Sequence, residues 1–289
     1  MLRTVVRTPV RDRRDWQRLI LPAAARVLEA APLRYTKRQL WYVLLSQHLI
    51  VLRRGENTED PYRALCRYSA KWQRQGRMES TIDQGRSLGV DLSFAGPDDA
   101  VAWLGRRYRR DRTEGQAVCL LVGAEKDSMR EQLGDWFSDR GIPRVLTRGY
   151  SSQPYVEDIT DYVEADGRPG VLVYAGDLDV DGDDILTDLI RRTGLKVIRV
   201  AINDDQIAGY DLATIAAKRK PNDPRRVRFR QTHGGFDAAV EIEAMDPVDL
   251  RALYDAAIAD YWDDDAYQAV LDREAEDRRR LGFDDGDDT

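Results

Sequence analysis

From residue 117 onward, short apolar runs alternate with amphipathic segments, and this alternation constrains the fold more than any other feature of the chain. Short apolar runs bounded by turns are typical of buried strands. Strands separated by helices predict a parallel sheet with helices on both faces. The predicted strands are 117–124, 144–147, 171–175 and 196–202, and the predicted helices include 128–140, 155–164 and 184–193. We therefore expect an α/β domain over 117–281, largely helical after residue 246.

The first 90 residues have helical periodicity and predict a separate domain. The third of its helices is the best marked, because Asp60 is a favourable N-cap, Pro61 a favourable first residue and Gly76 a favourable terminator. Three helices followed by a hairpin are typical of a winged helix-turn-helix, whose third helix lies in the major groove of DNA. The predicted elements are helices at 16–30, 36–47 and 60–76 and a hairpin at 78–88.

Charge is distributed unevenly along the chain. Residues 1–116 contain 23 Lys+Arg and 13 Asp+Glu, whereas residues 117–289 contain 22 and 38. This asymmetry favours polyanion binding by the N-terminal part and a carboxylate-rich site in the C-terminal part. Solvated charges that cluster by chance would give the same pattern. We expect a winged-helix domain over 1–90, an arginine-rich connector helix over 91–116, the α/β domain, and a disordered acidic tail over 282–289.

The third predicted helix has a basic stripe on a different face from its apolar stripe. In a DNA-binding domain such a stripe would contact phosphates, although basic stripes are also common on ordinary solvated helix faces. The predicted contacts with duplex DNA are Arg63, Arg67, Lys71 and Arg74, together with Arg86 in the hairpin and Arg148 after the strand 144–147.

Several protein classes do not fit this sequence. Cys66 and Cys119 follow no disulfide or metal spacing, which favours a reduced cytoplasm. The two histidines, His48 and His233, are too few for a histidine-rich zinc site and are expected to be ordinary hydrogen-bonding side chains. No run approaches the roughly 18 apolar residues needed to span a bilayer, and the N-terminus has no apolar signal region, so we expect no membrane partner.

Acidic residues follow two of the predicted strands. Glu125 comes after the strand 117–124, and Asp177, Asp179 and Asp181 come after the strand 171–175. Ligands of open α/β sheets bind at the carboxyl ends of the strands, so these acids are expected to lie close together. Carboxylate oxygens without histidine or thiolate select Mg²⁺ or Mn²⁺, ions that support phosphoryl transfer. The sequence therefore predicts a Mg²⁺ or Mn²⁺ site.

The same acidic segment also nearly matches a calcium-binding loop. Asp177-x-Asp179-x-Asp181-Gly182 followed by Asp188 has the spacing of an EF-hand. An EF-hand needs a helix before the loop, however, and the residues before Asp177 are strand-like. A calcium loop and a purely structural surface turn are the two alternatives to the Mg²⁺ or Mn²⁺ site.

Glu125 after one strand and Asp177 and Asp179 after another resemble the Toprim domain of topoisomerases, primases and related nucleases. An ordered set of motifs over about residues 30–280 resembles one branch of that family more closely. This branch contains the A subunit of topoisomerase VI, the meiotic double-strand-break transesterases and small prokaryotic Toprim proteins. The motifs are Thr36-Lys-Arg-Gln-Leu-Trp-Tyr42, Glu125-Lys-Asp, Thr147-Arg-Gly-Tyr-Ser-Ser152, Gly176-Asp-Leu-Asp-Val-Asp-Gly182 and Val240-Glu-Ile-Glu-Ala-Met245.

The resemblance implies a homodimer in which a winged-helix tyrosine attacks DNA and Toprim acids of the partner subunit bind the metal. The matching tyrosine is Tyr42, which lies nearly opposite the main apolar stripe of its helix, with Arg38 one turn earlier to stabilise a phenolate. Tyr42 could equally be a buried or interfacial aromatic. The chain has no Walker motif, so strand passage would need a separate ATPase subunit. The expected function is DNA cleavage by tyrosine transesterification in the cytoplasm, at the nucleoid; a hydrolytic Toprim nuclease and a non-catalytic DNA-binding subunit are the alternatives.

Overall fold

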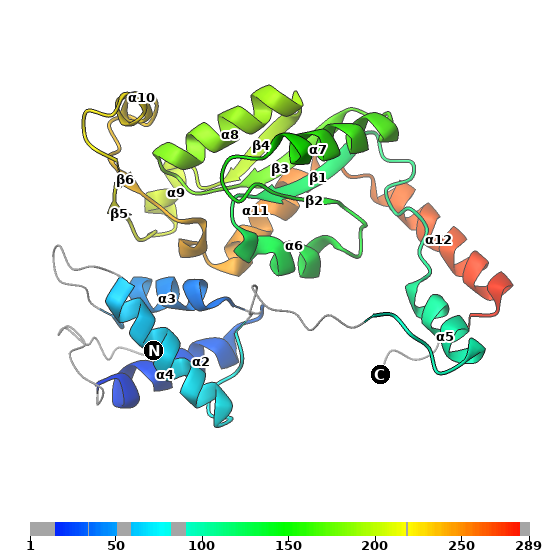
Figure 1. Ribbon diagram of the computed structural model, residues 1–289, viewed down its shortest axis with the longest axis horizontal. Helices are drawn as coiled ribbons and strands as arrows, with labels where there is room; N and C mark the ends of the chain where they lie inside the picture. The colour runs from blue at the N-terminus through cyan, green and yellow to red at the C-terminus, as the bar shows by residue number, and fades with distance from the viewer. Residues whose placement is uncertain (1–14, 34, 51–58, 82–90, 218, 284–289) are drawn as a thin grey trace.

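A four-stranded parallel sheet forms the centre of the molecule in the computed structural model, which describes residues 15–33, 35–50, 59–81, 91–217 and 219–283 (Figure 1). The strand order is β2-β1-β3-β4, so β1 and β3 are neighbours in the middle of the sheet. The strands begin and end within about two residues of the prediction. Their bounds are Cys119–Ala124 for β1, Arg144–Leu146 for β2, Gly170–Ala175 for β3 and Lys196–Ala201 for β4.

Helices cover both faces of the sheet, as the alternating pattern predicted (Figure 1). Successive strand residues point to opposite faces, so Leu121 and Leu172 pack with helices α7 and α8, whereas Val122 and Val173 pack in a separate cluster with α6 and α11. Tyr254 of α11 is fully buried there and donates a hydrogen bond to the carbonyl oxygen of Gly123 at 2.6 Å. The helices are α6 (Arg130–Phe137), α7 (Gln153–Asp166), α8 (Val180–Thr193) and α11 (Pro247–Ala259).

The N-terminal residues form a body of packed helices with its own apolar core. Thr36 begins α3 with a capping box, because its hydroxyl accepts from the Gln39 amide and the Gln39 side chain accepts from the Thr36 amide. The third predicted helix is also present, beginning one residue before Asp60. The elements are η1 (Trp16–Ile20), α2 (Leu21–Ala30), α3 (Lys37–Ser46) and α4 (Glu59–Arg74). Most of the predicted hairpin lies outside the described residues, so the winged helix stays a prediction.

The helical body is joined to the sheet domain by a buried polar junction. The side-chain amides of Gln39 and Gln132 exchange two hydrogen bonds, of 2.9 and 3.0 Å, between α3 and α6. Beside them, the hydroxyl of Tyr35 donates to Asp246 at 2.7 Å, and α3 packs against the short helix η3 (Ile242–Ala244). These buried hydrogen bonds favour one position of the helical body against the sheet domain, because a shift would leave buried polar groups without partners, which is energetically costly.

The arginine-rich connector is helical only over α5 (Pro97–Arg107), and its last arginines have internal partners. Arg110 pairs with Asp277 at 2.6 Å and Arg112 with Glu274 at 2.7 Å, both on helix α12 (Asp264–Leu281). These connector arginines therefore attach the connector to α12. Residues 284–289 of the predicted acidic tail lie outside the described residues.

A small excursion leaves the sheet domain beside the acidic segment (Figure 1). Strands β5 (Ile215–Ala216) and β6 (Ala238–Ala239) pair antiparallel, and helix α10 (Pro224–Thr232) lies between them in the sequence. The base of the excursion is fixed by two hydrogen bonds between the backbones of Leu178 and Val240, of 2.9 and 3.0 Å. The short helix α9 (Asp204–Gly209) precedes it.

Candidate metal and phosphodiester site

Glu125 and Asp177 lie side by side at the carboxyl edge of the sheet. They directly follow β1 and β3, which are adjacent, so the topology brings them together despite their separation in sequence. The backbone amide of Asp177 donates to Oε2 of Glu125 at 3.1 Å. Gly182 permits this packing, since a Cβ there would lie 2.4 Å from the backbone oxygen of Asp177 and 3.1 Å from Oε2 of Glu125.

The electrostatics of this pair favour the binding of a cation. Burial raises the pKa of Glu125 to about 7, and the negative charges of Asp177 and then Asp179 add to the effect. Burial also raises the pKa of Asp177, although the ammonium of Lys126 opposes this. Buried carboxylates that repel one another are stabilised by a divalent ion, and their hard oxygens suit Mg²⁺ or Mn²⁺.

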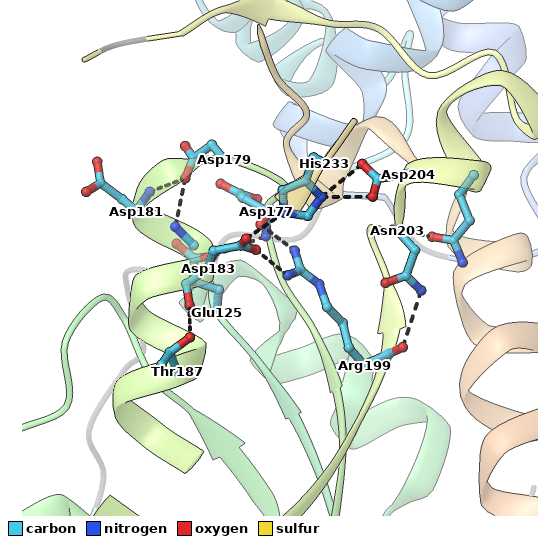
Figure 2. Close-up of polar contacts among 12 residues, drawn as sticks. Glu125, Asp177, Asp179, Asp181, Asp183, Thr187, Arg199, Asn203, Asp204 and His233 are labelled. Atoms are coloured by element: carbon cyan, nitrogen blue, oxygen red, sulfur yellow. Dashed lines mark hydrogen bonds and ion pairs between the residues drawn. The ribbon is translucent and has the colours of Figure 1, made fainter. Parts of the chain in front are cut away.

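Asp179 and Asp181 have other contacts in this arrangement (Figure 2). Asp179 is the N-cap of α8, and its Oδ1 accepts from the amides of Asp181 and Gly182 at 3.0 and 2.7 Å. Asp181 points away from Glu125 and pairs with Arg219. Of the four predicted metal ligands, the structure therefore brings Glu125 and Asp177 together and places Asp179 within electrostatic reach, but it directs Asp181 elsewhere.

The calcium-loop alternative is wrong. Strand β3 precedes Asp177, and α8 already begins at Val180, so residues that an EF-hand would use as loop ligands are helical. Asp188, the closing residue of the apparent pattern, lies within α8 and pairs with Arg191 and Arg192 of the same helix. The aspartate spacing therefore arises from the cap and the first turns of a helix.

No group of three or more His, Cys, Asp and Glu side chains in the described part of the chain is arranged to bind a metal ion. The oxygens of Asp177 are already in use: Oδ1 accepts from the Ile242 amide at 2.8 Å, and Oδ2 lies 3.1 Å from Nζ of Lys126. The residues fit Mg²⁺ or Mn²⁺ by donor chemistry and by the raised pKa of Glu125. A metal would have to compete with Lys126 for Asp177.

Lys126 is at the centre of a cluster that the sequence did not predict as a site. Its ammonium lies 2.6 Å from Glu243, 3.2 Å from Glu241 and 3.1 Å from Asp177. Burial alone lowers the pKa of Lys126, but these carboxylates outweigh burial and raise it well above its ordinary value. Lys126 and both glutamates belong to the motifs given above, so the residues themselves could be singled out from the sequence. Nothing in the sequence indicates, however, that residues 126 and 241 lie close together.

Tyr42 and Arg38 contact this cluster from α3, and of the two readings left open for Tyr42, the structure has it buried. Tyr42 is only 4% exposed, because the surface of α3 opposite the main apolar stripe is also covered. Burial and then the charge of Glu241 raise the pKa of its phenol well above the ordinary value, with Arg38 opposing. Arg38 lies 3.2 Å from Glu241, so its main partner is a carboxylate. Tyr42 is therefore neither exposed nor easily ionised in this arrangement.

His233 belongs to a relay of polar groups that reaches the backbone of Asp177 (Figure 2). Its ring nitrogens lie 2.6 Å from Asp183 and 2.8 Å from Asp204; burial lowers its pKa, but hydrogen bonds to these two carboxylates outweigh burial and raise it. Arg199 then donates to Asp183 at 2.6 Å and to the carbonyl oxygen of Asp177 at 2.8 Å. This set fixes the strand end that bears the acids.

The predicted DNA contacts are largely exposed. Arg63, Arg67, Lys71 and Arg74 all lie on the exposed surface of α4, whereas Leu65 and Trp72 of the same helix are buried. Arg148 is exposed and pairs with Asp127. Arg86 lies outside the described residues.

No protein-family model matches this sequence, and no curated protein matches it either. No helix in the described ranges is both long and apolar enough to cross a membrane. The fold and the contacts of named residues therefore carry the functional argument.

The raised pKa of Glu125 predicts a pH-dependent gain in stability for Glu125→Gln. Folding keeps this carboxyl protonated up to a pH of about 7, whereas its ordinary value is 4.5, so the wild type loses stability as pH rises between these values. Without metal, Glu125→Gln should be more stable at pH 8 by on the order of 3 kcal/mol, and equal to wild type below pH 4.5. Urea unfolding in EDTA measures this difference. Glu276→Gln, an exposed change on α12, is the control, and a gain that does not vary with pH would contradict the prediction.

Proposed function

We propose that this protein cleaves the phosphodiester backbone of duplex DNA with Mg²⁺ or Mn²⁺ bound by Glu125, Asp177 and Asp179. The observation that carries the proposal is the adjacency of Glu125 and Asp177 at the carboxyl edge of the parallel sheet, with the pKa of Glu125 raised to about 7. Buried acids that repel one another at a ligand-binding edge are typical of functional sites.

Each residue of the site has a role in this proposal. A bound divalent ion would stabilise the charge that develops on the attacking and leaving oxygens. Glu125 and Asp177 would hold the ion, together with Asp179, which is already ordered as the cap of α8. Lys126, 3.1 Å from Asp177, would supply a positive charge beside the bound phosphate.

The finer parts of the proposal rest on the resemblance described above. The sheet domain would be of the Toprim type, and the N-terminal body would be a winged helix that binds DNA through α4. A homodimer, a cytoplasmic setting at the nucleoid, and a separate ATPase subunit for any strand passage belong to the same proposal.

Supercoiled plasmid incubated with the protein and Mn²⁺ tests the proposed activity. Nicked or linear products that require the metal are expected, and denaturing gels run with and without protease reveal any protein bound to a DNA end. If neither Mg²⁺ nor Mn²⁺ supports cleavage, the protein is instead a non-catalytic DNA-binding subunit, and the proposal fails.

Water is the better supported attacking group, because Tyr42 is buried and its phenol resists ionisation. Transesterification by Tyr42 is the second candidate, favoured by Arg38, whose charge lowers the pKa of the Tyr42 phenol. Transesterification would require Tyr42 to leave its buried position and reach the DNA.

Tyr42→Phe separates the two mechanisms. The change removes one oxygen and leaves the packing of α3 intact, so folding and DNA binding should be nearly unchanged. We expect cleavage with Mn²⁺ to stay within a few-fold of wild type and no covalent protein–DNA adduct in either protein. Plasmid cleavage and protease-sensitive gel retardation are the measurements. Loss of cleavage together with loss of an adduct would establish the tyrosine mechanism.

A further inference from the structure

The strongest basic concentration in the sheet domain lies on the excursion that carries α10. Six of the twelve residues 219–230 are Lys or Arg and one is Asp, whereas the remainder of 117–289 contains 16 Lys+Arg and 37 Asp+Glu. We call residues 219–230 the arginine arm. The predicted DNA contacts do not include any residue of the arm.

Helix α10 has an inner face that attaches it to the molecule. Phe229 is buried and lies 4.3 Å, between ring centroids, from His233, which is itself bonded to Asp183 and Asp204. Arg226 is 11% exposed and pairs with Asp237 at 2.6 Å. Residues 226, 229 and 233 share one side of a helix, so the arm is anchored through this side.

Beside this inner face, the same helix carries Arg225 and Arg228, three residues apart. Arg228 is exposed, and Arg225 is 37% exposed. The carboxylates nearest to Arg225 are Asp184 at 3.6 Å, Asp223 of the arm at 3.7 Å and Asp181 at 3.9 Å, and Arg219 also pairs with Asp181. Partly exposed ion pairs at these separations contribute little, so a phosphate can replace the carboxylates at small cost.

The position of the arm relates it to the proposed active edge. Its excursion begins after α9 and ends at Val240, whose backbone pairs with that of Leu178, between Asp177 and Asp179. Arg219 and Arg225 of the arm pair with Asp181 and Asp184 in the first turns of α8. Tyr150, which is 54% exposed, donates to Asp184 at 2.7 Å and also contacts Arg225 of the arm. The arm therefore lies beside the start of α8, the helix that Asp179 caps.

We propose that the arginine arm is a second contact for the backbone of duplex DNA, in which Arg225 and Arg228 bind phosphates next to the scissile one. The inference rests on the proposed function for its choice of ligand. Arginine suits phosphate because its planar guanidinium can form two parallel hydrogen bonds. Asp181 and Asp184 act as internal substitutes for the phosphate until DNA binds.

The test is the binding of a labelled DNA duplex, measured by fluorescence anisotropy over a range of salt in EDTA, so that cleavage plays no part. Arg225→Ala/Arg228→Ala should lower the slope of log affinity against log salt by about 1.8 and weaken binding at 0.15 M salt by about 30-fold, because two phosphates would no longer be neutralised. Arg279→Ala/Arg280→Ala removes the same charge from exposed positions on α12, on the opposite side of the sheet domain from α10, and should change both quantities much less (Figure 1).

Arg225→Lys/Arg228→Lys keeps the charge and should keep most of the slope, which excludes loss of folding as the cause. Equal effects of the α10 and α12 alanine variants would overturn the proposal, and so would the absence of duplex binding by the wild type. Tighter binding to a duplex RNA of the same length would overturn DNA as the ligand. If the arm variant loses binding but the wild type shows no metal-dependent cleavage, the arm is a DNA contact and only the proposed cleavage activity is overturned.

Discussion

Asp177→Asn/Asp179→Asn is expected to reduce Mn²⁺-dependent DNA cleavage by about 10³-fold or more, because a catalytic metal contributes several kcal/mol to transition-state stabilisation. Asparagine preserves the local structure: it is a good N-cap at position 179, and at position 177 its oxygen can still accept from the Ile242 amide. Initial rates of plasmid nicking, with calorimetric Mn²⁺ titration of the same proteins, provide the measurement.

Asp188→Asn is the matched control for this double variant. It removes a carboxylate from the same helix, α8, but one that pairs with Arg191 and Arg192. Its cleavage and Mn²⁺ affinity should stay within a few-fold of wild type. Wild-type Mn²⁺ affinity in the double variant would show that these aspartates do not bind the metal.

Replacing Arg63, Arg67, Lys71 and Arg74 with alanine is expected to cause the largest loss of DNA affinity. If each of the four side chains neutralises one phosphate, their removal would lower the salt slope by about 3.6 and the affinity at 0.15 M salt by about 10³-fold. The four side chains are exposed on α4, so folding should be little changed. Fluorescence anisotropy with a labelled duplex at several salt concentrations measures both quantities.

A quadruple alanine variant at exposed arginines of α5 and α12 is the control for the change in net charge. Its positions are Arg106, Arg107, Arg279 and Arg280. Long-range attraction alone would affect both quadruple variants alike, whereas direct contact affects the α4 variant far more. Equal decreases in affinity would refute the assignment of α4 as the DNA-binding helix.

The sheet could be predicted from the sequence because its determinants are local. Buried parallel strands are short and apolar, and the segments between them have helical periodicity, so each element could be recognised from its own residues. Adjacency of Glu125 and Asp177 followed from the topology, since acids at the ends of neighbouring parallel strands meet at one edge.

The sequence left the burial of Tyr42 open, because its cover comes from residues distant in the chain, both in the N-terminal core and about 200 positions away. A helical wheel compares side chains of one helix and places Tyr42 opposite the apolar stripe. The surface that covers it includes Glu241, and nothing in either segment indicates that they meet. The cluster around Lys126 escaped prediction for the same reason.

Helix α10 escaped prediction for a different reason. Helical periodicity is detected from a repeated apolar face, and in Pro224–Thr232 Phe229 is the only buried residue. The inner face is completed by Arg226, whose charge is neutralised by Asp237. A helix attached by one aromatic ring and an ion pair resembles a polar loop in sequence.

Under the proposed function, the buried glutamine pair between α3 and α6 would help to set where along a DNA molecule a cut falls. Gln39 and Gln132 bond to each other through both side-chain amides, so the helical body cannot slide over the sheet domain without breaking both bonds. DNA bound by α4 would therefore reach the acidic edge at a constant offset. Cleavage products mapped on a single bound sequence should share uniform ends, and Gln39→Ala should make those ends heterogeneous before it lowers the amount of DNA cut.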